Sequence, residues 1–118
     1  MNYQGAMAER AAARYLQKRF YRLFKVNFMT YYGELDLVMR RGRTLVFVEV
    51  KARQVGDERL PREAVDLRKQ NNIIQASRLL MKAYHLEHLQ PRYDVCEVYI
   101  ENYEVKSIKH LANAFQLD

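Results

Sequence analysis

Two short stretches place acidic side chains and a lysine inside otherwise apolar sequence. They are residues 33–37 (GELDL) and residues 48–51 (VEVK). Buried charge costs free energy unless it is paired or holds a metal ion, so these side chains need an explanation. Twelve residues separate Asp36 from Glu49, and they include the turn-forming pair Arg41-Gly42. We therefore predict two antiparallel strands joined by a tight turn.

Strand geometry decides which of these side chains meet. With a two-residue turn at 41–42, Asp36 lies opposite Phe47, and Glu34 lies opposite Glu49. Side chains alternate between the two faces of a strand, so the acids share one face and the apolar side chains take the other. The side chains predicted on the acidic face are Glu34, Asp36, Glu49 and Lys51.

The residue types on this face suit metal-dependent hydrolysis of a phosphodiester. Two converging carboxylates bind a hard cation such as Mg²⁺ or Mn²⁺ through oxygen, which makes Asp36 and Glu49 candidate metal ligands. The backbone carbonyl of Val50 lies between them and is a further candidate ligand. A metal ion supplies a nucleophilic water near neutral pH. Lys51 can hold that water or stabilise the charge that develops on a phosphate.

An alternative explanation applies to Glu49 and Lys51 taken by themselves. Any ExK tripeptide is common in basic proteins, and an exposed strand face with a cross-strand ion pair accounts for it. Both strands are otherwise nearly all apolar, however, which indicates a central position covered on both faces. Charges at such a position favour the metal-site interpretation of the combined pattern.

Two residues in predicted helices are candidate assistants in catalysis. Lys69 shares the inward stripe of its helix with Ile73, four residues on. A lysine whose stem packs while its ammonium reaches water fits the same position. Glu9 borders the apolar face of the first helix, from where it could approach the metal ligands or pair with Arg10 or Arg14.

The composition favours a nucleic-acid partner, although many small basic proteins bind none. Twenty Lys and Arg against fourteen Asp and Glu give a formal net charge of +6 and a pI of about 9.5. This excess suits a polymer of phosphates. Arginines in the hairpin and in the loop that follows it are candidate contacts to the phosphate backbone, which position DNA without reading its sequence. These arginines are Arg41, Arg43, Arg53, Arg59 and Arg62.

The sequence also indicates in which cellular compartment the protein is expected. No apolar stretch reaches the roughly 20 residues that a membrane helix needs, and the N-terminal segment lacks the apolar core of a signal peptide. The single cysteine, Cys96, excludes an internal disulfide. We therefore expect a cytoplasmic protein without a membrane partner.

The length predicts one domain over residues 1–118. The predicted order of elements is αβββαββ, an α/β fold with a central mixed sheet of about five strands flanked by helices. Residues 54–60 are expected to form a flexible loop, Pro61 suits the first turn of the second helix, and residues 111–118 have no assignment. The predicted helices are residues 3–20 and 63–85, and the predicted strands are residues 21–28, 35–39, 44–52, 93–100 and 105–108.

Motifs along nearly the whole chain resemble those of a known family. They are GxxAExxA at residues 5–12, GELDL at 33–37, LVFVEVKxR at 45–53, PxEAV at 61–65, RYDV at 92–95 and HxxNAF at 110–115. Together they resemble the YraN-type family of small bacterial proteins. The resemblance implies a restriction-endonuclease-like fold of the PD-(D/E)xK superfamily, related to archaeal Holliday-junction resolvases. It also implies that Asp36, Glu49 and Lys51 are catalytic and that Glu9 and Lys69 assist them.

These observations lead to one functional expectation and two alternatives. We expect a Mg²⁺- or Mn²⁺-dependent endodeoxyribonuclease that acts on double-stranded or branched DNA, as a homodimer because related resolvases need two sites. The first alternative is an inactive nucleic-acid-binding module on the same fold. The second is a protein-interaction domain whose acids form structural ion pairs. Met29 stands where arginine is typical of the family, so a side chain that would contact phosphate or brace the site is replaced, which bears on substrate binding more than on metal binding.

Overall fold

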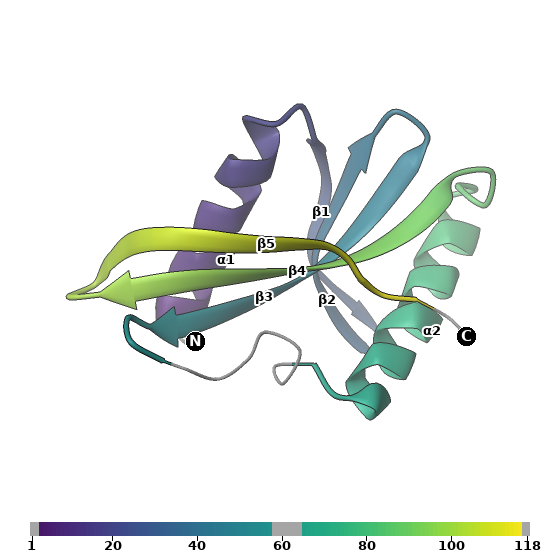
Figure 1. Ribbon diagram of the computed structural model, residues 1–118. Helices are drawn as coiled ribbons and strands as arrows, with labels where there is room; N and C mark the ends of the chain where they lie inside the picture. The colour runs from purple at the N-terminus through teal and green to yellow at the C-terminus, as the bar shows by residue number, and fades with distance from the viewer. Residues whose placement is uncertain (1–2, 58–64, 117–118) are drawn as a thin grey trace.

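The computed structural model describes residues 3–57 and 65–116 (Figure 1). Their elements follow the predicted order αβββαββ, which is thereby confirmed. The elements are α1 (Tyr3–Gln17), β1 (Arg22–Thr30), β2 (Gly33–Arg41), β3 (Thr44–Gln54), α2 (Leu67–Ala83), β4 (Gln90–Glu101) and β5 (Glu104–Phe115).

The five strands form one sheet in the order β1-β2-β3-β4-β5. β3 and β4 run parallel, and the other neighbouring strands are antiparallel. Parallel neighbours need a long crossover connection, and α2 lies in the connection between β3 and β4. The predicted mixed sheet is therefore confirmed.

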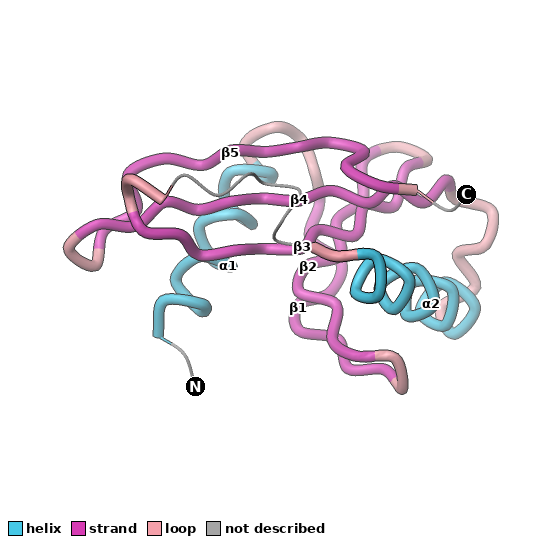
Figure 2. Tube along the Cα trace, turned by 60° about the horizontal axis from the view of Figure 1, so that its bottom comes forward, coloured by secondary structure: helices cyan, strands magenta, loops and turns pink. Residues whose placement is uncertain are grey.

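Each helix packs on a different face of this sheet. On β3, Leu45 and Phe47 pack in the cluster that contains the buried residues of α2, whereas Val46 and Val48 pack in the cluster of α1. The alternation of side chains along β3 thus divides the core into two layers. The two helices also lie toward different ends of the sheet (Figures 1 and 2). Neither helix of the described chain has the length and apolar character that a membrane crossing requires.

Both helices are shorter than predicted, because local backbone features stop them. α1 ends at Gln17, and the chain then turns at Phe20, whose φ is +71°. α2 begins at Leu67 because Asp66 is its N-cap, and the Asp66 side chain accepts a hydrogen bond from the Lys69 N–H at 2.9 Å. The Asp66 N-cap is a sequence signal that the prediction overlooked.

The predicted loop is described only in part. β3 continues to Gln54, and a turn follows it up to Asp57. The rest of the predicted loop and the predicted helix start at Pro61 lie outside the described residues.

β5 is much longer than predicted and includes most of the unassigned tail. Most of its side chains are exposed, so it lacks the apolar alternation that identifies a half-buried strand. The contacts that hold it come from β4 instead. Phe115 stacks on Tyr93 with ring centroids 5.4 Å apart.

The buried carboxylate of Asp94 ties β4 to β5 and accounts for the outer motifs. Asp94 accepts two hydrogen bonds from the Arg92 guanidinium and one from the Asn113 N–H, and it hydrogen-bonds to His110 Nε2 at 2.7 Å. Together these partners outweigh the effect of burial and lower the pKa of Asp94. The motifs at residues 92–95 and 110–115 therefore stabilise the fold.

The register of the β2–β3 hairpin differs from the prediction by two residues. Arg41 pairs with Thr44, and Phe47 pairs with Val38, so the expected position of Asp36 opposite Phe47 is wrong. The turn residues are Gly42 and Arg43, and Gly42 adopts a φ of +60°, which favours glycine at this first turn position. A shift of two residues does not by itself move a side chain to the other face of the sheet.

The ladder between β2 and β3 stops at the pair Leu37–Val48. Before that point β2 departs from regular alternation: Leu35 packs in the α2 cluster, whereas Leu37 packs in the α1 cluster. The prediction that both leucines share one face is wrong for this reason. Asp36 lies between them, at the point where the two strands separate.

Candidate metal centre

The Asp36 carboxylate occupies the gap that opens between β2 and β3. Its Oδ2 accepts a hydrogen bond from the Val50 N–H at 2.9 Å, so the side chain takes the place of a ladder partner. Asp36 is half-buried. A carboxylate in such a gap can meet side chains that approach from either face of the sheet.

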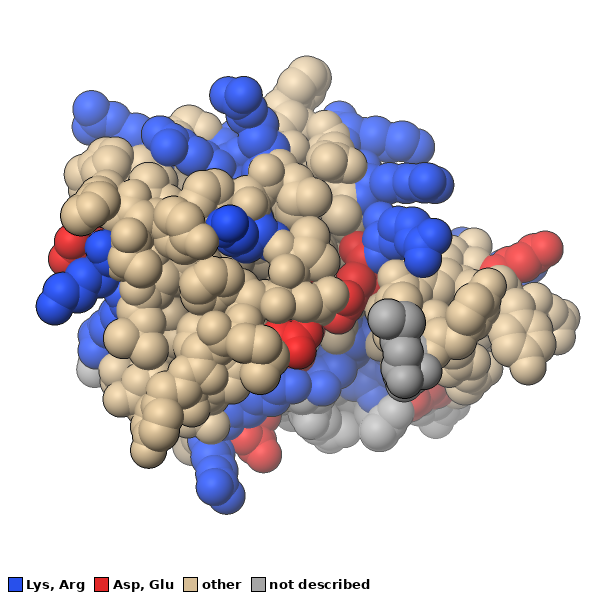
Figure 3. All heavy atoms as spheres, turned by 180° about the vertical axis from the view of Figure 1, so that it is seen from behind, with Lys and Arg blue, Asp and Glu red and all other residues tan. Residues whose placement is uncertain are grey.

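Three carboxylates meet at this gap. Glu9 of α1, Glu34 of β2 and Asp36 each offer an oxygen, and these atoms lie within 4.8 Å of one another. Oxygen ligands that share one hard cation lie up to about 4 to 5 Å apart, twice the metal–oxygen distance. The donor set therefore fits a divalent cation that prefers oxygen. Figure 3 shows a band of acidic side chains on one face of the molecule, with Lys and Arg side chains on both sides of it.

Glu49 and two lysines complete the centre from the side of α2. The Glu49 side chain is only 5 % exposed, and its Oε1 pairs with Lys69 Nζ at 2.8 Å. The negative charge of Glu49 acts on Asp36, and the positive charge of Lys69 acts on Lys51. The structure thus brings together all five residues that the sequence predicts as catalytic. They come from α1, β2, β3 and α2.

Crowding of the acids shifts their proton affinities. Burial raises the pKa of Asp36 to about 8, with a second contribution from the negative charge of Glu49, while the Val50 N–H opposes the shift. Burial also raises the pKa of Glu9, helped by the charges of Glu34 and Glu49. Without a cation, the centre therefore keeps protons that isolated carboxyl groups would lose.

The two lysines of the centre are not equivalent. Burial and the neighbouring Lys69 lower the pKa of Lys51. Burial also acts to lower the pKa of Lys69, but the hydrogen bond and charge of Glu49 outweigh it and raise that pKa. Lys69 is therefore a fixed cation on Glu49, and Lys51 releases a proton more readily.

The raised pKa of Asp36 predicts how pH affects the stability of the metal-free protein. Between pH 4 and 8 the folded state binds more protons than the unfolded state, so the free energy of unfolding falls as pH rises. Glu9 contributes with the same sign. We expect a loss of at least about 1 kcal/mol, or about 3 °C in Tm, measured in EDTA from pH 5 to 8.5. Asp36→Asn should show a smaller decline, and equal declines in both proteins would contradict the prediction.

The structure places Arg53 inside the protein and not at the surface. Its side chain is 3 % exposed, and its Nε pairs with the buried carboxylate of Glu97 at 2.5 Å. Its Nη1 reaches Asp57 at 3.4 Å, and its Nη2 is buried without a hydrogen-bond partner in the described chain. A guanidinium in this position cannot reach a DNA phosphate, so the expected phosphate contact is replaced by a structural ion pair.

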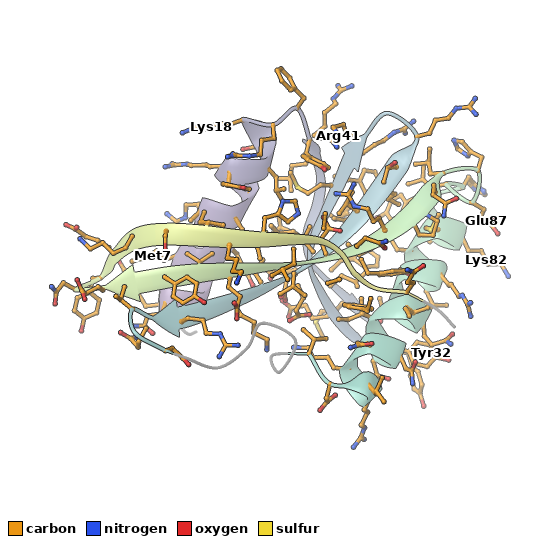
Figure 4. All side chains as sticks on the ribbon, in the orientation of Figure 1. Met7, Lys18, Tyr32, Arg41, Lys82 and Glu87 are labelled. Carbon is orange, nitrogen blue, oxygen red and sulfur yellow. The ribbon has the colours of Figure 1, made fainter. Side chains whose placement is uncertain are left out.

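Two of the other predicted DNA contacts, Arg41 and Arg43, do not lie beside the metal centre. Arg41 is exposed near the β2–β3 turn, where its guanidinium lies over the Tyr21 ring at 4.1 Å. Arg43 is in that turn, at the other end of β2 and β3 from Asp36. Figure 4 shows how far Arg41 lies from Tyr32, at the start of β2. Arg59 and Arg62 lie outside the described residues.

Two residues of the centre were not predicted as part of it. Glu34 was placed on the acidic face but not among the ligands, although its neighbour Asp36 was a signal. Asn27 hydrogen-bonds with Glu9, and it has a φ of +50° within β1, which no sequence pattern indicates. For Val50, the N–H and not the carbonyl contacts Asp36, so a carbonyl ligand stays a prediction.

Comparison with known proteins is consistent across the chain. Residues 8–98 match the family described as "Uncharacterised protein family UPF0102". Members of that family from Caldanaerobacter subterraneus and Desulforapulum autotrophicum are 37 % and 40 % identical to the chain, over 94 % and 97 % of its length. In each case the match covers 93 % of the relative. A relative from Clostridium beijerinckii is 35 % identical over 97 % of the chain and 94 % of its own length.

Proposed function

The chain belongs to the uncharacterised family UPF0102, which is the YraN-type family, and we propose that it is a metal-dependent nuclease that hydrolyses phosphodiester bonds of DNA. The supporting observation is that four carboxylates and two ammonium groups converge at the gap between β2 and β3. A charged cluster of this kind is costly unless a cation or an anionic ligand compensates it. A divalent cation would compensate the carboxylates, and a phosphodiester bound to it would compensate the ammonium groups.

Each group of the centre has a part in this proposal. Asp36, with Glu9 and Glu34, would hold the cation, and Glu49 would complete its oxygen ligands. When bound, a divalent cation activates water and stabilises negative charge on a phosphoryl oxygen.

The two lysines supply what the carboxylates cannot. Lys69 orients the Glu49 carboxylate through their 2.8 Å contact. Lys51, whose pKa is lowered by burial and by Lys69, orients the attacking water and donates hydrogen bonds to the phosphate as charge builds up on it.

DNA is the substrate that the charge distribution and the superfamily resemblance favour. The formal net charge of +6 suits a polymer of phosphates, and Figure 3 shows Lys and Arg side chains on both sides of a band of acidic side chains. Double-stranded or branched DNA and a homodimer follow from the likeness to resolvases. Gel filtration of the protein alone and with DNA tests the homodimer.

Cleavage of DNA tests the proposed function directly. We expect the wild-type protein to cut a labelled DNA branch or plasmid in Mn²⁺ or Mg²⁺ and to leave it intact in EDTA. The rate should fall as salt rises, because binding releases counterions from the phosphates. Intact DNA in both buffers, from a protein that is folded by circular dichroism, would count against a nuclease.

The Glu49–Lys69 pair favours one alternative function. Their contact of 2.8 Å is a complete internal ion pair, as expected of a protein-interaction domain whose acids are structural. The two functions differ in their response to metal. A cation that binds only the folded state raises Tm by mass action, so a titration with Mn²⁺ that leaves Tm unchanged would favour the interaction domain.

A further inference from the structure

The tip of the β1–β2 hairpin carries two tyrosines that the fold does not bury. They form the connection between the paired residues Thr30 and Gly33. Tyr31 is 91 % exposed and Tyr32 is 40 % exposed. An aromatic side chain stabilises a fold by the apolar area that it removes from water. The Tyr31 ring contributes little in that way, and the Tyr32 ring keeps a large part of its surface open to a ligand.

The turn holds the two rings in a defined arrangement. The Thr30 hydroxyl donates a hydrogen bond to the Gly33 carbonyl at 2.8 Å and accepts one from the Tyr32 N–H at 3.1 Å. Gly33 has a φ of +124°, which only glycine adopts readily. The rings of Tyr31 and Tyr32 meet edge to face, with centroids 5.2 Å apart. A fixed ring loses less conformational entropy when a partner binds it.

The tyrosines lie next to the metal centre. Tyr32 and Glu34 line one side of a cavity of about 140 Å³, and Lys69 and Asn72 of α2 line the other. Figure 4 shows Tyr32 beside α2. Glu34 belongs to the acidic cluster, and Lys69 contacts Glu49. A ligand that reaches from the metal centre past Glu34 therefore meets the Tyr32 ring first and Tyr31 next.

We propose that Tyr31 and Tyr32 stack on an unpaired base of a nucleic acid whose phosphate lies at the metal centre, an inference that rests on the proposed function. Aromatic side chains bind bases through their flat faces without reading sequence. A base inside a continuous duplex is already stacked on both faces and presents none to a ring. The tyrosines therefore select single-stranded segments, gaps or branch points over intact duplex.

The test compares binding of one labelled single strand and of the corresponding blunt duplex by fluorescence anisotropy. Both are measured in Ca²⁺, which carboxylate oxygens also bind. The double variant Tyr31→Ala/Tyr32→Ala should bind the single strand about fivefold or more weakly, the loss expected of one lost stacking contact. Its affinity for the duplex should not change. The double variant Tyr31→Phe/Tyr32→Phe should bind both ligands as the wild type does.

Tyr103→Ala provides a matched control. Tyr103 is 74 % exposed and lies in the turn between β4 and β5, so its loss should leave both affinities unchanged. Wild-type affinity of the alanine double variant for the single strand would overturn the inference, as would an equal loss for strand and duplex. If the wild type binds neither ligand, the inference also fails, and the tyrosines then fit a protein partner. Metal-dependent cleavage is measured separately, so failure of the stacking role leaves the nuclease proposal standing.

Discussion

Asp36→Asn is expected to abolish metal-dependent cleavage of DNA. Asparagine keeps an oxygen that can accept the Val50 N–H, so the hydrogen bond at the gap survives. It removes the negative charge on which the other carboxylates and a cation would converge. A bound metal ion contributes several kcal/mol to stabilising the transition state. We therefore expect a rate loss of about 10³-fold or more in single-turnover cleavage with Mn²⁺.

Two further variants separate metal binding from catalysis and from general effects of charge. Glu104→Gln removes an exposed carboxylate of β5, far from the gap, that pairs only with Lys106 among the described residues. It should cut DNA at the wild-type rate. Lys51→Met leaves every carboxylate in place, so it should keep the rise of Tm in Mn²⁺ and lose cleavage. Wild-type cleavage by Asp36→Asn would exclude the proposed mechanism.

Glu97→Ala is expected to be the most destabilising single change in the sheet. Glu97 is completely buried and pairs with the buried guanidinium of Arg53, and Tyr99 donates a hydrogen bond to its other oxygen at 3.2 Å. Removing the carboxylate leaves the Arg53 charge buried, with the Asp57 contact at 3.4 Å as its remaining ion pair in the described chain. Breaking a buried ion pair in this way costs about 3 to 5 kcal/mol. Urea unfolding followed by circular dichroism measures the loss.

A double variant distinguishes a buried unpaired charge from a loss of packing. Arg53→Met/Glu97→Leu replaces both charges with apolar side chains, and such replacements are often neutral or stabilising. It should recover most of the stability that Glu97→Ala loses. Glu101→Ala, an exposed acid on the same strand, should change stability by no more than about 0.5 kcal/mol. If the double variant is as unstable as the single one, the ion-pair explanation is wrong.

These expectations assign opposite roles to two charged clusters that share strand β3. Arg53 and Glu97 are buried and paired with each other, and Arg53 also contacts Asp57, so their charges are taken up inside the protein. At the metal centre the acids outnumber the cations that touch them, and Glu34 is exposed. The metal centre differs from the Arg53–Glu97 pair in its excess of negative charge and its access to solvent, and both properties allow it to bind a cation. An arginine that resembles a DNA contact in the sequence can therefore be a structural residue.

The order of elements, the apolar hairpin and the acids within it could be predicted from the sequence. These depend on local patterns: the helical spacing of small residues in α1, and the alternation that keeps Asp36 and Glu49 away from the α1 side of the sheet. A hairpin register that was wrong by two residues did no harm, because side-chain direction repeats every two residues. The predicted family and the mixed sheet followed from the same patterns.

The tertiary structure alone decided which side chains meet. β2 is separated from β3 before Leu37, and this separation lets Glu9, from a helix on the opposite face, approach Asp36. The inward position of Arg53 depends on Glu97, which lies 44 residues away in the chain. β5 is a strand because β4 pairs with it and Asp94 binds its backbone. Such contacts join segments that are distant in the chain, so they produce no periodic pattern in the sequence. Helix and strand propensities act between neighbouring residues, so they do produce such a pattern.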